Sequence, residues 1–161
     1  MFQKFQVLEN KIKDKLISHL FSRYGIDKQY FKDYEFYKHE NSVYLLSKKY
    51  CKAVNINLKD KQLFNVGLEI FADYKKYLPS SIGFEIFKTK QIKQNFVVLD
   101  RGQAISYFQN KELEVNKIKE KNILSDGYLI VIYNNYIIGT IELKNKSTLF
   151  PNLSFVNYDV K

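Results

Sequence analysis

A hydrophobic hairpin near the end of the chain restricts the possible folds more than any other segment. Residues 127–143 read GYLIVIYNNYIIGTIEL, with strand-forming residues on either side of Asn134 and Asn135. Asparagine tolerates the positive φ angles of a two-residue hairpin turn. We therefore expect two paired strands whose apolar side chains belong to the core.

The composition is that of a folded protein with a substantial core. The chain has 161 residues, enough for one domain of usual size or two small ones, and 45% of them are hydrophobic. The single cysteine, Cys51, excludes an internal disulfide and is predicted to be a small buried residue on a helix. Together with His19 and His39 it provides no metal-ligand cluster. No apolar run approaches the ~20 residues of a membrane span, and charges interrupt the start of the chain, so we expect a soluble, cytoplasmic protein.

The chain carries a formal net charge of +9, which favours a nucleic-acid partner. Almost all of this charge comes from lysine, because Arg23 and Arg101 are the only arginines. A proteome-wide bias toward lysine, isoleucine, asparagine, tyrosine and phenylalanine would explain the same composition. The charge is uneven, since residues 1–92 hold 17 basic and 10 acidic side chains and residues 93–161 hold 9 and 7. The excess therefore lies in the N-terminal half.

The N-terminal half is predicted to combine helices with short strands. Residues 4–22 have apolar side chains at helical spacing, among them Leu20 and Phe21, and Gly25 is expected to end this helix. The aromatic residues around positions 28–38 alternate with lysines and could stack on bases, but their spacing favours core positions. The other predicted elements are two strands within residues 34–47 joined through residues 39–42, a helix over 48–55 capped by Ser47, a strand element within 62–75 with a bulge or close backbone approach at Gly67, and a helix over 81–90 that starts at Pro79.

The polar stretch of residues 88–94 is predicted to be a domain boundary, which divides the chain into residues 1–92 and residues 93–161. The elements predicted beyond it are a buried strand over 95–100, a short helix over 104–108, a polar connection over 110–127, the hairpin, and a tail over 147–161 in which Leu149, Phe150, Leu153 and Phe155 close a small barrel.

The chain lacks the motifs that usually carry catalysis or cofactor binding. GxGxxG, GxxxxGK[ST], HExxH and GxSxG are all missing. Asp100, Arg101 and Gly102 follow a predicted strand, where catalytic groups can lie, but a solvated turn with an unusual φ at Gly102 is favoured. We therefore expect no catalytic residue, no metal and no cofactor, and we predict that the protein is not an enzyme.

The C-terminal half resembles the PUA domain, a small RNA-binding pseudo-barrel. In that family a helix ends near a G-x-[DE]-[LV] step, and a G-D-x-V-x-V strand pairs through a hairpin with a strand that ends in x-x-G-x-G. Residues 110–113 stand at the first step, with Asn110 in place of glycine. Residues 126–131 stand at the second step with the Gly-Asp order reversed, and residues 138–140 stand at the third.

Residues 42–87 are similar to the domain that precedes PUA in the Nip-seven ribosome biogenesis proteins, particularly their archaeal members. Residues 43–47 fit the V-Y-x-[LV]-[SN] pattern, residues 67–72 stand at the G-x-x-[FI]-[GA] step with one residue more, and residues 78–80 stand at the family's [FL]-x-P-[NS] step. A similar pair of domains forms part of some RNA cytosine methyltransferases, which share an L-K-N…P tail comparable to residues 143–145 and Pro151. The resemblance covers about residues 24–155. It implies an α+β fold, with an N-terminal antiparallel sheet and helices followed by a C-terminal PUA-type β pseudo-barrel.

The resemblance also implies where RNA would bind. Archaeal Nip-seven proteins carry paired arginines just after the last barrel strand, where this chain has Lys144 and Lys146 followed by uncharged residues. Lysine contacts phosphate as a point charge, so binding here is expected to be weaker or to extend toward the basic N-terminal half. Replacing both lysines by glutamate is predicted to weaken RNA binding without unfolding the protein. The candidate RNA-binding residues are Lys144, Lys146, Arg101, Lys121, Lys93 and Lys161.

Two functions are consistent with these features. The favoured one is a monomeric, non-enzymatic RNA-binding factor that acts in processing or assembly of large-subunit ribosomal RNA. Its partners would be single-stranded or looped RNA and other ribosome assembly factors. The alternative is a protein-docking subunit for an RNA methyltransferase or an assembly partner, which predicts an exposed apolar patch on the N-terminal domain.

Overall fold

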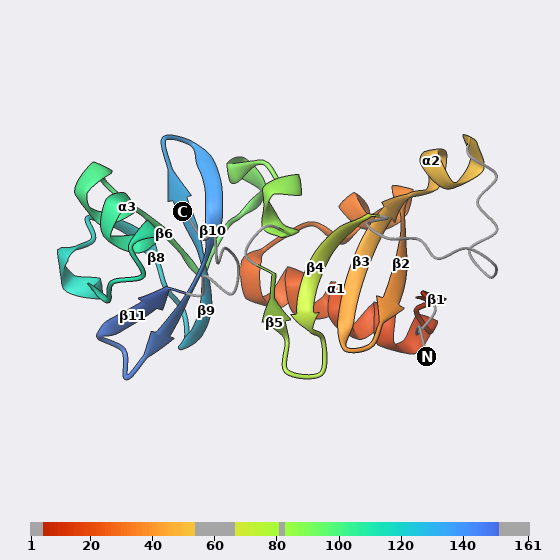
Figure 1. The fold of residues 1–161 in the computed structure, drawn as a ribbon, viewed down its shortest axis with the longest axis horizontal. Coiled ribbons are helices and arrows are strands. Elements are labelled where there is room, and N and C mark those ends of the chain that lie inside the picture. The colour runs from red at the N-terminus through yellow and green to blue at the C-terminus, as the bar shows by residue number, and fades with distance from the viewer. Residues whose placement is uncertain (1–4, 54–66, 81–82, 152–161) are drawn as a thin grey trace, which may run out of the picture.

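The computed structural model describes residues 5–53, 67–80 and 83–151. It is an α+β fold with two sheets and a few helices (Figure 1). The first sheet is antiparallel, with strand order β1-β2-β3-β4-β5. The second sheet curls around its own core, with strand order β7-β11-β10-β9-β6-β8, and its one parallel pair joins β6 to β9. The predicted mixed fold with an N-terminal antiparallel sheet is therefore confirmed.

The N-terminal elements pack α1 against the five-stranded sheet, as Figure 1 shows. Leu16 and Leu20 of α1 join a buried cluster with Phe36, Leu45 and Ile70 of the central strands. The strands are β1 (Gln6–Val7), β2 (Tyr34–His39), β3 (Ser42–Ser47), β4 (Leu68–Asp73) and β5 (Leu78–Pro79), and the helices are α1 (Asn10–Tyr24), η1 (Lys28–Asp33), α2 (Lys48–Ala53), η2 (Gly83–Ile86) and η3 (Thr89–Gln91).

The first helix starts later than residue 4. Residues 6 and 7 form β1 instead, because their backbone pairs with Lys38 and Tyr37 of β2. The predicted end of the helix is confirmed, since Gly25 adopts a left-handed φ of +71° and its N–H donates to the carbonyl of Phe21 at 2.8 Å. A strand pairing that sequence periodicity did not reveal therefore limits the helix at its N-terminal end.

The predicted hairpin within residues 34–47 and the helix after it are confirmed, the helix as far as Ala53. Cys51 lies on α2 but is only half-buried, with its sulfur 3.9 Å from the hydroxyl of Tyr37. The close approach predicted at Gly67 is also confirmed, since a Cβ there would lie 2.6 Å from the Leu45 carbonyl oxygen. The parts of the predictions that fall on residues 54–55 and 62–66 lie outside the described residues.

The helix predicted over residues 81–90 is wrong in its described part. Residues 83–91 form two short 3₁₀ helices, η2 and η3, separated by an extended backbone at Lys88. Side chains three apart lie on one side of a 3₁₀ turn, and Phe84 and Phe87 are both buried in this way. The Lys88 N–H donates to Gln91 Oε1 at 2.7 Å, so a side chain stabilises the break that interrupts a continuous helix.

The C-terminal half contains the predicted hairpin. Asn134 and Asn135 have φ angles of +47° and +64° between the two strands, which confirms the two-residue turn. The predicted strand and short helix before it are also present, whereas the 110–127 connection contains two strands of its own. The elements are β6 (Phe96–Val98), α3 (Arg101–Phe108), β7 (Leu113–Glu114), η4 (Val115–Lys117), β8 (Glu120–Asn122), β9 (Gly127–Tyr133), β10 (Tyr136–Lys144) and β11 (Thr148–Pro151).

Two predictions about loops need correction or stay open. Gly102 lies in the first turn of α3 with ordinary helical geometry, because Asp100 caps this helix by accepting from the Gln103 N–H at 2.9 Å. In the tail, Leu149 of β11 is buried and Phe150 is half-buried. The predicted contributions of Leu153 and Phe155 lie outside the described residues.

Strand β9 supplies side chains to both halves of the molecule. Leu129 and Val131 are fully buried in the core of the six-stranded sheet. Ile130 and Ile132 point to the opposite face and join the cluster formed by α1 and the first sheet. The strands of the first sheet precede residues 88–94 in the sequence, and those of the second sheet follow them. The hairpin fills the contact between the two sheets, which we call the seam. The division into two domains at this point stays a prediction.

Candidate nucleic-acid interface

Arg23 connects the two halves at the end of α1. Its Nε and Nη2 donate to the carbonyl of Tyr128 at 3.2 Å and 3.0 Å, and its Nη1 donates to Ser125 Oγ. Gly127 has a φ of +107°, and a Cβ there would lie 3.2 Å from Arg23 Nη2. Gly127 therefore allows both the positive φ of the backbone here and the close approach of the Arg23 guanidinium.

The side chain of Asn95 holds the same seam from the other side. Its Nδ2 donates to the carbonyl of Arg23 at 2.6 Å, and its Oδ1 accepts from the N–H groups of Leu124 and Ser125 at 3.0 Å and 3.3 Å. Its backbone carbonyl accepts from the Ile130 N–H at 2.9 Å. Asn95 is buried and has a φ of +54°, a conformation that asparagine tolerates better than most residues. The relative position of α1 and β9 is thus fixed by buried polar contacts as well as by apolar packing.

A groove with a volume of about 850 Å³ lies beside β8, and we call it the β8 groove. It brings together two of the predicted RNA-binding residues, Lys121 from β8 and Lys146 from the turn between β10 and β11. Neither lysine makes an ion pair with a described residue. The residues that line the β8 groove are Val115, Lys121, Asn122, Ile123, Leu124, Ser125, Asp126, Leu143 and Lys146.

The other predicted residues do not line this groove. Lys144 lies at the end of β10, where its Nζ is 3.1 Å from Glu142 and 5.1 Å from the centre of the Phe150 ring. Lys93 is exposed, and its carbonyl accepts from Asn122 Nδ2 at 2.9 Å. Arg101 is exposed on the first turn of α3. Lys161 lies outside the described residues.

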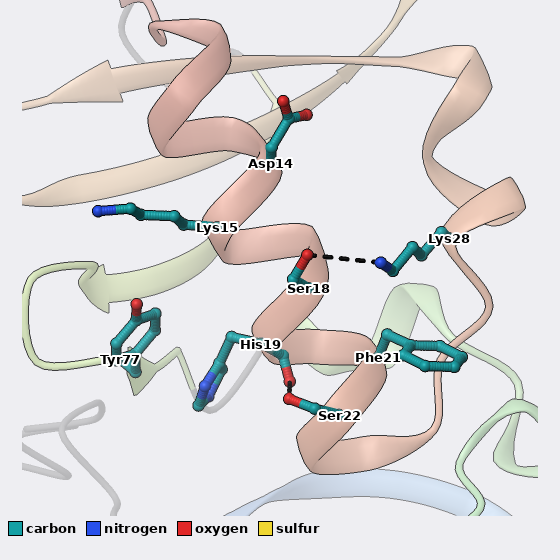
Figure 2. A pocket seen from close by; sticks show the side chains of 8 residues that line it. All are labelled: Asp14, Lys15, Ser18, His19, Phe21, Ser22, Lys28 and Tyr77. Atoms are coloured by element: carbon teal, nitrogen blue, oxygen red, sulfur yellow. Dashed lines mark hydrogen bonds between the residues drawn. The ribbon is translucent and has the colours of Figure 1, made fainter.

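A second groove crosses the exposed side of α1, and we call it the α1 groove (Figure 2). Tyr77, from the turn between β4 and β5, stands on one side of the helix, and Lys28, at the start of η1, stands on the other. The groove has a volume of about 750 Å³, within the ~300–1,000 Å³ of small-ligand sites. The residues that line it are Asp14, Lys15, Ser18, His19, Phe21, Ser22, Lys28 and Tyr77.

The sequence patterns did not predict the α1 groove. Phe21 was expected to share the apolar face of the helix, yet its side chain is 50% exposed. It follows Leu20, which is fully buried, so only one of these neighbours can face the sheet. By contrast, the predicted core role of the aromatic residues at positions 28–38 is confirmed for Phe31, Phe36 and Tyr37, which are all buried.

Arg23 links residues of the two groove linings through the seam. Ser22 lines the α1 groove, and the next residue, Arg23, donates to Ser125, which lines the β8 groove. The Arg23 charge has no carboxylate partner among the described residues, because its hydrogen bonds go to a hydroxyl and to carbonyl groups. A positive charge without a carboxylate partner therefore lies in the seam, next to Ser22 of the α1 groove and Ser125 of the β8 groove.

The ring of His19 lies against Tyr77 in the α1 groove. The two ring centres are 4.1 Å apart and the ring planes are inclined by 20°. Burial, and then the positive charge of Arg23, lower the pKa of His19 from 6.5 to about 4. His19 is therefore neutral at pH 7 and adds an aromatic surface, not a charge.

No group of three or more His, Cys, Asp or Glu side chains that could hold a metal ion occurs in the described ranges. Within the same ranges, no helix is long and apolar enough to cross a membrane. Comparison with models of known protein families and with curated proteins gives no match.

Proposed function

We propose that this protein is a non-enzymatic RNA-binding factor of ribosome biogenesis, with a PUA-type C-terminal domain. The observation that supports it most is the positive charge of Lys121, Lys146 and Arg23 around the β8 groove and the seam, since none of the three makes an ion pair with a described residue. The resemblance of residues 24–155 to the Nip-seven proteins favours ribosomal RNA as the target.

The chemistry of this face suits a phosphate backbone. Ammonium groups that are not neutralised by carboxylates bind phosphate and release condensed counterions. Phosphate contacts would provide most of the affinity, and contacts to unpaired bases in a loop would provide the preference. The protein would act by holding or shielding RNA, without making or breaking a covalent bond.

Titration of a fluorescently labelled, looped ribosomal RNA fragment tests this proposal. The dissociation constant is measured by anisotropy at several salt concentrations between about 50 mM and about 200 mM. We expect binding at low salt that weakens steadily with log[salt]. Lack of binding at low salt, or binding that salt does not change, would contradict the proposal.

A matched pair of variants locates the contact. Lys121→Gln with Lys146→Gln removes the two unpaired lysines of the β8 groove, and we expect the salt slope to fall by about 0.7 for each lost contact to a single strand. Lys111→Gln with Lys119→Gln removes the same charge from exposed positions that line neither groove. Equal losses in the two double variants would mean that only net charge matters.

The docking alternative also has an observation in its favour. Ile105 and Phe108, three residues apart on α3, are 49% and 60% exposed. Such a patch would suit a protein partner, although it lies on the C-terminal half and not on the N-terminal half where the alternative placed it. A protein that binds no RNA at low salt, but whose binding to a methyltransferase partner is lost on Phe108→Ser, would support docking.

A further inference from the structure

Two aromatic rings of the α1 groove remain open to solvent, as Figure 2 shows on either side of the helix. Phe21 is 50% exposed and Tyr77 is 36% exposed. His19 covers Tyr77 and supports its ring in the stacked arrangement described above. Exposed flat rings on a rigid support are the elements from which platforms for unpaired bases are built.

The backbone of Tyr77 is unusual for its residue type. It has a φ of +52°, in the left-handed region that favours glycine and asparagine. Its N–H donates to the carbonyl of Tyr74 at 3.4 Å in the turn between β4 and β5. Because a large side chain is disfavoured in this conformation, the turn keeps an aromatic ring at the groove against a local cost.

The charges around the rings are positive. Lys15 and Lys28 make no ion pair with a described residue, and Lys28 Nζ lies 5.3 Å from the centre of the Phe21 ring and 3.5 Å from Ser18 Oγ. Asp14 is the one carboxylate among the residues that line the groove. The Ser18 hydroxyl accepts from Lys28 and can donate to a ligand, whereas the Ser22 hydroxyl donates to the carbonyl of His19 at 3.2 Å and can only accept.

We infer that the α1 groove binds unpaired RNA nucleotides. Bases stack on Phe21 and Tyr77, and Lys15 and Lys28 contact the flanking phosphates. An acidic polypeptide would also match the lysines, but it would have no use for two exposed rings; the combination of flat rings with unpaired ammonium groups favours a single-stranded nucleic acid. The inference rests on the proposed function and adds a second contact, joined to the β8 groove by Arg23.

The absence of tryptophan from the sequence allows a direct test. Phe21→Trp introduces a single indole at an exposed position of the groove, and its fluorescence is recorded during titration with a single-stranded RNA oligonucleotide. We expect strong quenching, because a base stacked on an indole quenches its fluorescence by electron transfer. The same length of RNA duplex should quench weakly. An unchanged signal from RNA that does bind, as judged by anisotropy, would overturn the inference while leaving the proposed function intact.

Affinity measurements on ring variants provide an independent readout. Phe21→Leu and Tyr77→Leu keep apolar bulk but remove the flat ring, and we expect each to weaken single-strand binding by roughly fivefold or more. Tyr136→Leu is the matched control, because Tyr136 is 73% exposed and lines neither groove. Should Tyr77→Leu fold poorly, Phe21→Leu decides, since it changes an exposed helical position. Equal affinity of Phe21→Leu and the unaltered protein would overturn the inference.

Two further measurements separate this site from the β8 groove and from a polypeptide ligand. Lys121→Gln with Lys146→Gln, made in the Phe21→Trp protein, should lower the affinity but leave the quenching at saturation unchanged. If the lysine double variant loses RNA binding while Phe21→Leu and Tyr77→Leu leave the affinity unchanged, the RNA contacts only the β8 groove and the inference is wrong. Polyglutamate that binds as tightly as RNA, and is equally affected by the ring variants, would identify an acidic polypeptide as the ligand and contradict the inference.

Discussion

The two sheets bury their apolar side chains in different ways. The five-stranded sheet places most of its buried residues on the one side that α1 covers, in a cluster with Leu16 and Leu20. The six-stranded sheet has a central strand, β9, that is buried on both faces. The second sheet therefore completes the core of the first, and this shared packing sets the position of the α1 groove relative to the β8 groove.

The largest predicted effect tests whether the two cores unfold together. Leu129→Ala removes side-chain volume from the second core, and Ile130→Ala removes it from the first, at positions that are both fully buried. Each substitution should lower the free energy of unfolding by about 2–5 kcal/mol, as measured by chemical denaturation. Both variants should unfold in a single transition, because adjacent residues of one strand belong to the two cores.

A control substitution defines the size of this effect. Ile105→Ala, at an exposed position of α3, should change the free energy of unfolding by less than about 0.5 kcal/mol. Two separate transitions, with Ile130→Ala shifting only one of them, would show that the halves fold independently and that the seam is a weak contact.

The next prediction concerns the polar side of the seam. Asn95→Ala leaves the Arg23 carbonyl and two N–H groups without their partner, so we expect a loss of about 2–3 kcal/mol in the free energy of unfolding. Asn110→Ala is the matched control, because Asn110 has a similar φ of +56° but is exposed. Both substitutions impose the same backbone cost. Equal losses would show that the side-chain hydrogen bonds of Asn95 contribute nothing.

The sequence predicted features that depend on neighbouring residues. The hairpin turn follows from the tolerance of Asn134 and Asn135 for positive φ, and the end of α1 follows from Gly25. Helical spacing could not show that Phe21 faces solvent, because Phe21 lies at the edge of the apolar stripe in which Leu20 is fully buried. The helix predicted over residues 81–90 failed because Gln91 accepts from the Lys88 N–H and stabilises an extended backbone between two 3₁₀ turns.

The candidate site depends on contacts between distant parts of the chain, which local patterns do not contain. Arg23 and Tyr128 are 105 positions apart, so their hydrogen bonds follow only from the packing of α1 on β9. The same holds for the stacking of His19 on Tyr77. The family pattern did direct attention to Lys146, but its neighbour in the groove, Lys121, could be chosen only from charge. Only the folded structure shows which residues come together in the α1 groove and which in the β8 groove.

A third prediction uses pH to test the burial of His19 on α1, in the N-terminal half of the molecule. Between pH 6.5 and about 4, the unfolded chain binds a proton at position 19 that the folded protein does not. The free energy of unfolding should therefore decrease as the pH is lowered through this range. His19→Gln should reduce the difference between the free energies of unfolding at pH 7 and pH 4.5. The expected reduction is about 1–2 kcal/mol, less than the full shift of the pKa would give, because His19 is partly exposed to solvent. An identical pH dependence in the variant would contradict the burial of this ring.

The smallest effect separates Lys146, which lines the β8 groove, from Lys144, which ends β10 and does not line it. Lys144 is 3.1 Å from Glu142, whereas Lys146 has no carboxylate partner among the described residues. Since a nearby carboxylate offsets part of the attraction to phosphate, Lys146→Gln should weaken RNA binding about twofold to threefold more than Lys144→Gln. Anisotropy titrations at one low salt concentration measure this difference.

A double-mutant cycle then assigns the difference to Glu142. In a Glu142→Gln background the carboxylate is gone, so Lys144→Gln should weaken RNA binding more than it does in the unaltered protein. Glu142→Gln alone should raise the affinity slightly and change the free energy of unfolding by less than about 1 kcal/mol, because the ion pair is partly exposed to solvent. Glu112→Gln removes the same charge from an exposed position outside both grooves. If Glu112→Gln changes the effect of Lys144→Gln on the affinity as much as Glu142→Gln does, then only net charge matters and the ion pair has no role in binding.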